Sequence, residues 1–357
     1  MGDFYAAIDL GTTSVEVSLL RTDGSVTAKS GFANPQSRFG SDVISRMTYQ
    51  QKHPGDTAMQ DCLKNELRDT LSKMLSWNKA AFPVDLNRIL VTCNTVMGSL
   101  FLGYDTGMLG QAPFGMPFSK NEETNLFGVP MTIPVGASAF LGSDACGGAW
   151  VLGLGEGEVL MDLGTNGEMI VCHDGIFHGA SAACGPAFEN CTRSRGIYGS
   201  TTISVLANLL RQGKLREDGV LTEEQARDGI EFRGIRITAK ILHEIQLASA
   251  AIYATYAMLL KRAGLAAGDV KKICLAGGFG FHLSLRDAVT IGLIPEEMLD
   301  RVTIAGNTSL LASERMVTEG TDSYDAFRRK VHTQQLAGDP DYEGLLYSSM
   351  ILGKRNL

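Results

Sequence analysis

The residues best suited to chemistry lie in two short segments of nearly the same sequence. The first, AIDLGTTSVEVSLL, runs from Ala7 to Leu20, and the second, LMDLGTNGEMIVC, runs from Leu160 to Cys172. In each segment an aspartate ends an apolar run and is followed by glycine and by hydroxyl or amide side chains. Glycine permits a tight turn, and the N–H groups and short polar side chains of such turns bind phosphate oxygens. The repeat therefore predicts two phosphate-binding loops.

The same roles are predicted for both copies. Asp9 and Asp162 are expected to hold the water molecules of a Mg²⁺ ion. The predicted phosphate-binding residues are Gly11, Thr12, Thr13 and Ser14 in the first loop and Gly164, Thr165, Asn166 and Gly167 in the second. One Asp-x-Gly-Thr segment is equally typical of a simple turn between strands, so the interpretation depends on there being two.

A third glycine-rich segment, KKICLAGGFGFHLSL, follows much later in the chain. It places Gly277, Gly278 and Gly280 after a predicted strand at Ile273–Leu275. Small residues there let the backbone approach a flat ring or a ribose. The same arrangement is common where any strand leads into a helix, so alone it leaves both interpretations open. The sequence contains no Walker-type phosphate loop.

These loops require strands on both sides, and the sequence predicts them. The expected strands are Tyr5–Asp9, Val15–Arg21 and Val26–Lys29 in the first copy and Glu158–Asp162 and Glu168–His173 in the second. Asp23-Gly24 and Asp174-Gly175 are typical hairpin turns. Helices are predicted at Met59–Trp77 and Ala239–Arg262, the second capped by Thr238 and ended by Gly264.

The two copies lie a domain's length apart, which favours two related α/β halves over a short repeat. The predicted halves are residues 1–150 and 151–357, with C-terminal helices that return to the first half. The glycines between Gly147 and Gly157 are interpreted as a hinge or crossover, and Gly103–Phe118 as a long loop.

Composition narrows the class of protein. The 357 residues carry a formal net charge of −7, which argues against nucleic acid and anionic membranes as main partners. No leader-like segment or apolar run long enough for a membrane span is present, so we expect a cytoplasmic protein. The seven cysteines form no C-x-x-C pair and are interpreted as reduced, mostly buried thiols. A cluster shared between subunits through Cys184 and Cys191 is the alternative.

Two phosphate loops followed by a glycine-rich turn resemble the actin-like ATPase superfamily, which includes acetate and sugar kinases and the heat-shock ATPases. The resemblance implies a duplicated ribonuclease-H-like α/β fold with two lobes around a nucleotide cleft. It also implies ATP and Mg²⁺ as cofactors, and Gly277, Gly278 and Gly280 as the adenosine side.

A narrower resemblance covers nearly the whole chain. The segments that carry it are NPQSRFGSDVISR, CNTVMGSLFLGYD, FLGSDACGG, DLGTNGE, CGPAFEN, EIQLASAAI, GGFGFHLSLRDAVTIGLIP and AGNTSLLAS. Together they look like the ATPase module of the reductive activators of corrinoid proteins. In that family, ATP hydrolysis is coupled to the reduction of inactive Co(II) corrinoid to Co(I). The resemblance implies an ATPase that forms a homodimer and has a corrinoid protein as its partner.

Such activators usually carry an iron–sulfur domain before this module, and the sequence begins directly at the first loop. We therefore expect a separate iron–sulfur protein as electron donor. Asp144 stands where kinases of the superfamily place a catalytic aspartate; a helix N-cap is its alternative role. Glu168 is a rival for positioning the attacking water. The segment DVISR at Asp42–Arg46 shows no phosphate chemistry of its own and suggests an interface or packing role.

Two other functions stay open at this point. One is a small-molecule kinase, which needs an acceptor pocket and a base at Asp144. The other is a nucleotide-gated module that binds a partner with little turnover. Phosphoryl transfer to an added metabolite distinguishes the kinase, and partner-stimulated ATP turnover distinguishes the activator from the binding module.

Overall fold

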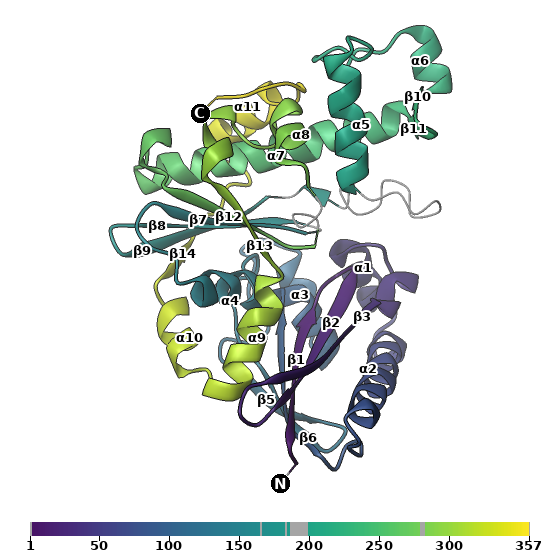
Figure 1. The fold of residues 1–357 in the computed structure, drawn as a ribbon, viewed down its shortest axis with the longest axis vertical. Helices are drawn as coiled ribbons and strands as arrows, with labels where there is room; N and C mark the ends of the chain where they lie inside the picture. Colours follow the sequence, from purple (N-terminus) through teal and green to yellow (C-terminus); the bar gives the residue numbers. More distant parts are fainter. Residues whose placement is uncertain (1, 165, 183, 186–198, 279–282, 357) are drawn as a thin grey trace. The chain divides into compact units, whose positions relative to one another are not determined.

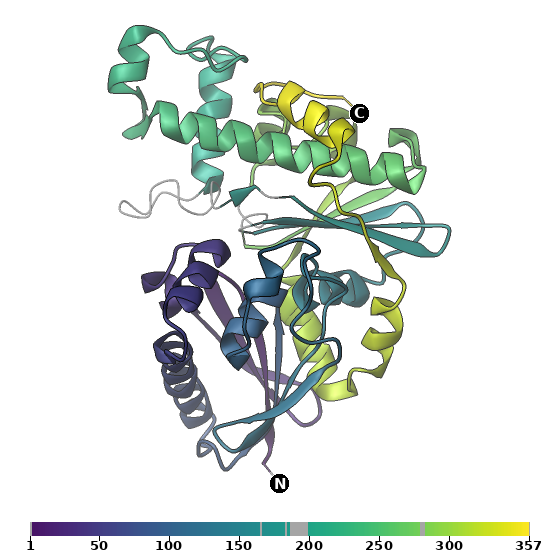
Figure 2. The same cartoon turned by 180° about the vertical axis from the view of Figure 1, so that it is seen from behind.

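The computed structural model describes residues 2–164, 166–182, 184–185, 199–278 and 283–356. The chain divides into two compact units, each with its own sheet and hydrophobic core. The first unit comprises Met1–Gly153 and Asn307–Thr333, and the second comprises Leu154–Gly306 and Gln334–Leu357 (Figures 1 and 2). The chain therefore leaves the first unit, builds most of the second, returns to the first and ends in the second.

The first unit contains a mixed sheet of strand order β3-β2-β1-β4-β6-β5. Its strands are β1 (Phe4–Leu10), β2 (Ser14–Arg21), β3 (Val26–Ala33), β4 (Leu86–Cys93), β5 (Glu122–Leu126) and β6 (Val129–Ile133). The first three strands are antiparallel neighbours, whereas β4 runs parallel to both β1 and β6. The three strands predicted for this part of the chain are confirmed.

Helices cover both faces of this sheet (Figures 1 and 2). They are α1 (Val43–Lys52), α2 (Ala58–Trp77), α3 (Thr95–Leu102), α4 (Ser143–Leu152), α9 (Thr308–Glu319) and α10 (Asp322–Arg328), with single turns at η1 (Pro35–Arg38) and η2 (Gly107–Leu109). Helix α9 packs on β1 and β4. Helix α2 lies on the other face of the sheet and buries leucines that recur at every fourth position. The short strand β14 (Val331–Thr333) ends the returning segment.

The second unit repeats the same arrangement of strands. Its sheet contains β13-β12-β7-β8-β9 in that order, with β7 (Glu158–Leu163), β8 (Gly167–His173), β9 (Ile176–Ala182), β12 (Lys272–Ala276) and β13 (Val302–Gly306). Strands β7, β8 and β9 are antiparallel neighbours, and β12 runs parallel to β7 and β13. Taken from β9 to β13, the order β9-β8-β7-β12-β13 and the strand directions match β3-β2-β1-β4-β6 of the first unit. This match confirms the predicted duplicated fold.

The remaining elements of the second unit include one long helix, α7. These elements are α5 (Gly199–Arg211), α6 (Glu223–Asp228), α7 (Ala239–Ala263), α8 (Leu285–Thr290), α11 (Pro340–Ser348), the hairpin β10 (Ile230–Phe232) and β11 (Ile235–Ile237), and the turns η5 (Ala267–Asp269) and η7 (Glu296–Arg301). The hydroxyl of Thr238 accepts a hydrogen bond from Ile241 N at the start of α7. Gly264 ends the helix with φ +78°, as the sequence predicts.

The predicted hinge between Gly147 and Gly157 is wrong for its first part. Gly147 and Gly148 lie inside α4 and are buried. A Cβ at Gly147 would lie 2.9 Å from the Cβ of Ala312 in α9, so glycine allows these two helices to approach closely. The segment Gly103–Phe118 is a loop as predicted, interrupted only by the single turn η2.

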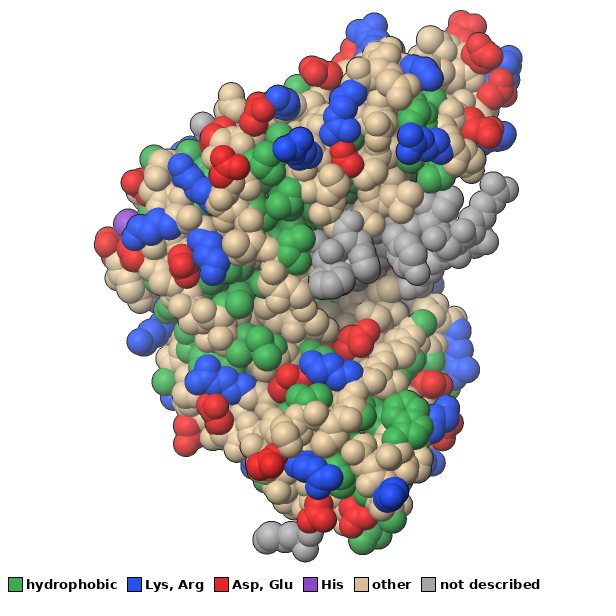
Figure 3. Space-filling model, viewed as in Figure 1, with side chains coloured by type: hydrophobic (Ala, Val, Ile, Leu, Met, Phe, Trp, Pro, Cys, Tyr) green, Lys and Arg blue, Asp and Glu red, His purple; other side chains and the backbone are tan. Residues whose placement is uncertain are grey.

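On the face shown in Figure 3, acidic and basic side chains are interspersed over both units, which keeps the local net charge small. Among the cysteines that the structure describes, Cys62 is half-buried and the other five are buried, all as free thiols. None of the helices in the described part of the chain combines the length and the apolar character of a membrane-spanning segment.

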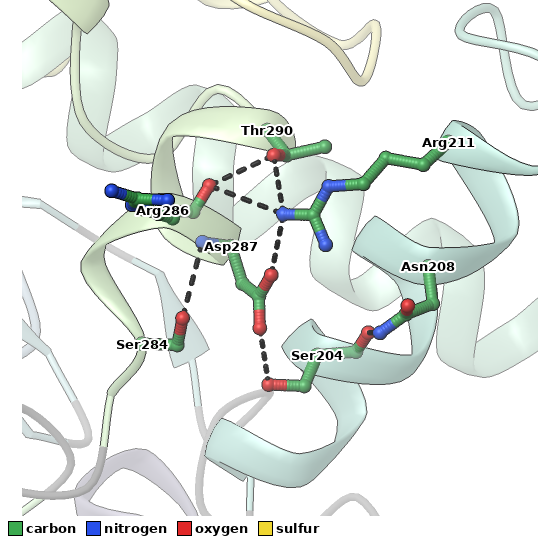
Figure 4. A network of polar contacts seen from close by, with 7 residues as sticks. All are labelled: Ser204, Asn208, Arg211, Ser284, Arg286, Asp287 and Thr290. Carbon is green, nitrogen blue, oxygen red and sulfur yellow. Dashed lines mark hydrogen bonds and ion pairs between the residues drawn. The ribbon is translucent and has the colours of Figure 1, made fainter.

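A polar network fixes α8 against α5 within the second unit (Figure 4). The carboxylate of Asp287 accepts from Arg211 Nη2 at 2.5 Å and from the Ser204 hydroxyl at 2.6 Å. The same guanidinium nitrogen donates to Thr290 Oγ1 at 2.8 Å. Because Asp287 is buried, its charge needs these donors.

We predict that Asp287→Asn lowers the free energy of unfolding by about 1–2 kcal/mol, because it removes a charge-assisted bond at a buried site. Hydrogen exchange of the α5 amides is expected to accelerate with it. The matched control is Arg286→Met, which removes an exposed side chain but leaves the backbone carbonyl that the network uses. Equal protection of α5 in wild type and Asp287→Asn contradicts a fixing role.

Candidate functional site

The first loop turns directly between β1 and β2. Gly11 follows the last residue of β1, and Ser14 begins β2. A Cβ at Gly11 would lie 2.7 Å from the carbonyl oxygen of Ser14, so this turn requires glycine. Thr12 is almost fully buried, and its hydroxyl accepts a hydrogen bond from Asn94 Nδ2 at 3.2 Å. Gly11, Thr12, Thr13 and Ser14 are thus brought together in one compact turn.

Asp9 is held by two residues that the sequence analysis missed. Asn307 Nδ2 donates to Asp9 Oδ2 at 2.8 Å, and the Ser309 hydroxyl donates to Asp9 Oδ1 at 2.7 Å. Both belong to the start of α9, where Asn307 is also the N-cap. Burial raises the pKa of Asp9, and the two hydrogen bonds oppose that rise. The segment AGNTSLLAS was the only signal for these residues, and it gave no indication of their partner.

Asp144 lies near Asp9 in the first unit. It occupies the first turn of α4, whose N-cap is Gly142, so the N-cap interpretation of Asp144 is wrong. Its carboxylate accepts from Ala145 N at 2.8 Å. Burial, and to a smaller extent the charge of Asp9, raise the pKa of Asp144 to about 7. A carboxyl group with this pKa exchanges protons at neutral pH, as a general base must.

Glu16 is a third carboxylate of this group, and the sequence analysis did not single it out. It is the register partner of Asp9 across β1 and β2. Burial and then the charge of Asp9 raise the pKa of Glu16, whereas Lys29 lowers it. The sequence repeat could have indicated Glu16, because Glu168 holds the same position opposite Asp162 in the second copy.

The second loop repeats this geometry within the second unit. Asp162 is the penultimate residue of β7 and lies opposite Glu168 of β8, and Gly164 N donates to the carbonyl of Asn166 at 2.9 Å. The Ser181 hydroxyl donates to Glu168 Oε1 at 3.4 Å. Gly167 begins β8, and Thr165 lies outside the described residues.

The glycine-rich turn lies directly beside the second loop. Gly277 has φ +88°, and a Cβ there would lie 2.5 Å from the carbonyl of Leu163 and 2.6 Å from Asp162 Oδ1. Gly278 follows Gly277 beyond the last residue of β12, and Gly280 lies outside the described residues. The structure therefore brings the predicted adenosine turn and Asp162 into direct contact.

Each unit thus presents carboxylate oxygens beside a glycine turn. Asp9, Glu16 and Asp144 offer carboxylate oxygens, the ligand type that Mg²⁺ prefers, but their oxygens do not all lie within 4.8 Å of one another, which suits a Mg²⁺ ion held through its water molecules. Burial is the first cause of the raised pKa of all three carboxyl groups, and the charge of Asp9 adds to it for Glu16 and Asp144. The residues present fit a Mg²⁺-polyphosphate.

Fold and loops together define a protein of the actin-like ATPase class. Residues 4–156 match the family described as RACo middle region, and residues 156–192 and 190–357 match the C-terminal domain of RACo, the ASKHA domain. The chain belongs to this family.

A curated protein and a solved structure are also similar to this chain. The corrinoid activation enzyme RamQ of Eubacterium limosum is 28% identical over 362 residues, covering 81% of this chain and 60% of RamQ. The solved structure of a reductive activator for corrinoid, iron-sulfur protein superposes with a TM-score of 0.84 at 24% identity, covering 98% of this chain and 66% of that one. The chain spans less than two thirds of the length of either relative.

We predict that Gly277→Ala lowers the free energy of unfolding by about 2 kcal/mol or more, because the new methyl group meets backbone and the φ angle is unfavourable. Adenosine binding should weaken with it. Gly278→Ala is the matched control for stability alone, since a Cβ there meets no described atom within 4 Å. Urea unfolding compares the two variants, and equal losses of stability at both positions contradict the steric argument.

The raised pKa of Asp144 predicts a pH dependence of stability. The folded chain holds a proton that the unfolded chain releases near pH 4, so stability should fall as pH rises from about 4 to 7. Without Mg²⁺, Asp144→Asn should reduce this fall by about 1–2 kcal/mol. Urea unfolding at pH 5 and pH 8 measures it, and an identical pH slope in both proteins contradicts the shift.

Proposed function

We propose that the chain binds MgATP and hydrolyses it to drive the reductive reactivation of a corrinoid protein, from Co(II) to Co(I). The observation that carries the proposal is the duplicated strand–turn–strand unit, with an aspartate and a glycine turn in each copy. Membership of the RACo family and the names of the two relatives support the choice of partner.

The residues take defined roles in this proposal. Asp9 and Asp162 hold Mg²⁺ through its water molecules, and the loops at residues 11–14 and 164–167 bind phosphate oxygens through N–H and hydroxyl groups. Gly277, Gly278 and Gly280 provide the adenosine side. A Mg²⁺ ion held by these residues would compensate the negative charge of the phosphates.

The attacking water needs a group that accepts its proton or fixes its orientation. Asp144 has the pKa for that role, and Glu168, opposite Asp162, is the alternative. ATP can promote reduction only by binding one arrangement of the protein more tightly than another. We propose that the chain forms a homodimer and that its ATP-bound arrangement docks the corrinoid protein. In this proposal a separate iron–sulfur protein delivers the electron.

A small-molecule kinase is the second candidate, and the pKa of Asp144 favours it. A base with a pKa of about 7 can accept the proton of an acceptor hydroxyl as readily as that of water. The two functions differ in the product, which is a phosphorylated metabolite in one and inorganic phosphate in the other.

The decisive experiment mixes the protein anaerobically with a Co(II) corrinoid protein, MgATP and titanium(III) citrate. We expect ATP-dependent growth of the Co(I) absorption and of free phosphate. Asp9→Asn should abolish both, because it removes the charge that binds the metal. The chemical reductant makes the result independent of the natural electron donor.

The control variant is Asp69→Asn, which removes an exposed aspartate of α2 in the same unit. It should behave as wild type. Phosphate release without Co(I) formation against a panel of corrinoid proteins contradicts the activator function, and phosphorylation of an added sugar or carboxylate establishes the kinase.

A further inference from the structure

Three successive backbone carbonyls of the first loop are bound from one segment of the chain. Asn34 Nδ2 donates to Gly11 O at 2.9 Å, and Asn34 N donates to Thr13 O at 2.8 Å. Between them, Arg46 Nη2 donates to Thr12 O at 2.7 Å. The loop that is predicted to bind phosphate is therefore anchored through its carbonyl oxygens.

This anchoring has a direct electrostatic consequence. Carbonyl oxygens repel phosphate oxygens, whereas N–H groups attract them, so an anion-binding loop must direct its carbonyls away from the anion. In a trans peptide the C=O of one residue and the N–H of the next point in opposite directions. Donors that hold the carbonyls of residues 11–13 therefore fix which edge of these peptides can face an anion.

Burial of Arg46 beside the loop carries an unfavourable free energy of desolvation. Its side chain is fully buried, and burying a guanidinium is unfavourable unless its donors are satisfied. Besides Thr12 O, it donates through Nε to Gly40 O at 3.0 Å and approaches Met97 Sδ at 3.2 Å through Nη1. Its positive charge lies next to the loop, where it also favours an anion.

The residues before Arg46 explain how it is positioned. Asp42 and Ser45 form a reciprocal cap at the start of α1, with Ser45 N donating to Asp42 Oδ1 at 2.8 Å and Asp42 N donating to Ser45 Oγ at 3.1 Å. A Cβ at Gly40 would lie 2.7 Å from Arg46 N, so glycine lets the chain pass close to α1. The segment DVISR thus builds the start of the helix that carries the arginine.

We infer that Arg46, together with Asn34, is a positioning residue of the first phosphate loop. It sets the orientation of the loop peptides and adds positive charge beside them, without contacting the reacting atoms. The inference rests on the proposed function insofar as this loop binds the phosphates of MgATP. It assigns a role in polyphosphate binding to a segment that shows no phosphate-binding motif.

The test separates phosphate binding from adenosine binding. Arg46→Met removes the charge and both carbonyl bonds, Arg46→Lys keeps the charge without the planar fork, and Arg38→Met removes an exposed arginine of η1 as the control. Calorimetry with MgATP, MgADP and adenosine measures affinity, and circular dichroism checks the fold. We expect Arg46→Met to weaken MgATP and MgADP at least about tenfold and Arg46→Lys about threefold or more. Adenosine affinity should change less than twofold in both.

Each other outcome decides against the inference. Unchanged MgATP affinity in folded Arg46→Met overturns it, as does an equal loss for MgATP and adenosine. If Arg46→Met does not fold, Arg46→Lys carries the comparison under the same criteria. A wild-type protein that binds no MgATP overturns both proposals, whereas Arg46-dependent MgATP binding without Co(I) formation overturns the corrinoid function alone.

Discussion

The partly buried carboxylate of Asp9 is the constraint on which the first unit depends. A carboxylate removed from water is unfavourable unless donors replace the lost hydration. Here the donors are Asn307 and Ser309, which are separated from Asp9 in sequence by most of the second unit. The first unit is complete only after the chain has returned with α9, which also packs on β1 and β4.

The two copies share their strand order but differ in how the loop is supported. Asp9 pairs with Glu16, and Asp162 pairs with Glu168, so the first loop is one residue longer between its paired acids. The longer loop has its carbonyls bound by Asn34 and Arg46. The shorter loop closes on itself, with Gly164 N donating to Asn166 O, and rests against the turn at Gly277. Duplication has thus kept the fold and the aspartate while the means of holding the turn diverged.

What could be predicted from the sequence follows from the range of the interactions. Strands β1, β2, β7 and β8 and helix α7 carry local signals in their alternation, turn residues and caps, and these elements lie where the sequence predicts them. Asn307 and Ser309 carry no local sign that they hold Asp9, because hydrogen bonds between distant residues have no periodicity. The prediction of a hinge at Gly147 was wrong for the same reason, because glycine is needed there for the close approach of α9, which is distant in sequence. The segment Asp42–Arg46 suggested an interface or packing role, and its sequence carried no local sign that Arg46 binds the carbonyl of Thr12.

The order of elements also connects the glycine turn of the second unit with the aspartate of the first. Within the second unit, Gly277 N donates to the carbonyl of Gly306 at 3.2 Å, at the end of β13. The next residue, Asn307, begins the returning segment, accepts a hydrogen bond from Leu310 N at 2.8 Å and donates to Asp9. A change of the Gly277 turn that moves Gly306 must therefore act on Asn307 through one peptide bond. The Gly277 turn and the carboxylate of Asp9 are thereby connected through a hydrogen bond to Gly306, one peptide bond, and a hydrogen bond from Asn307.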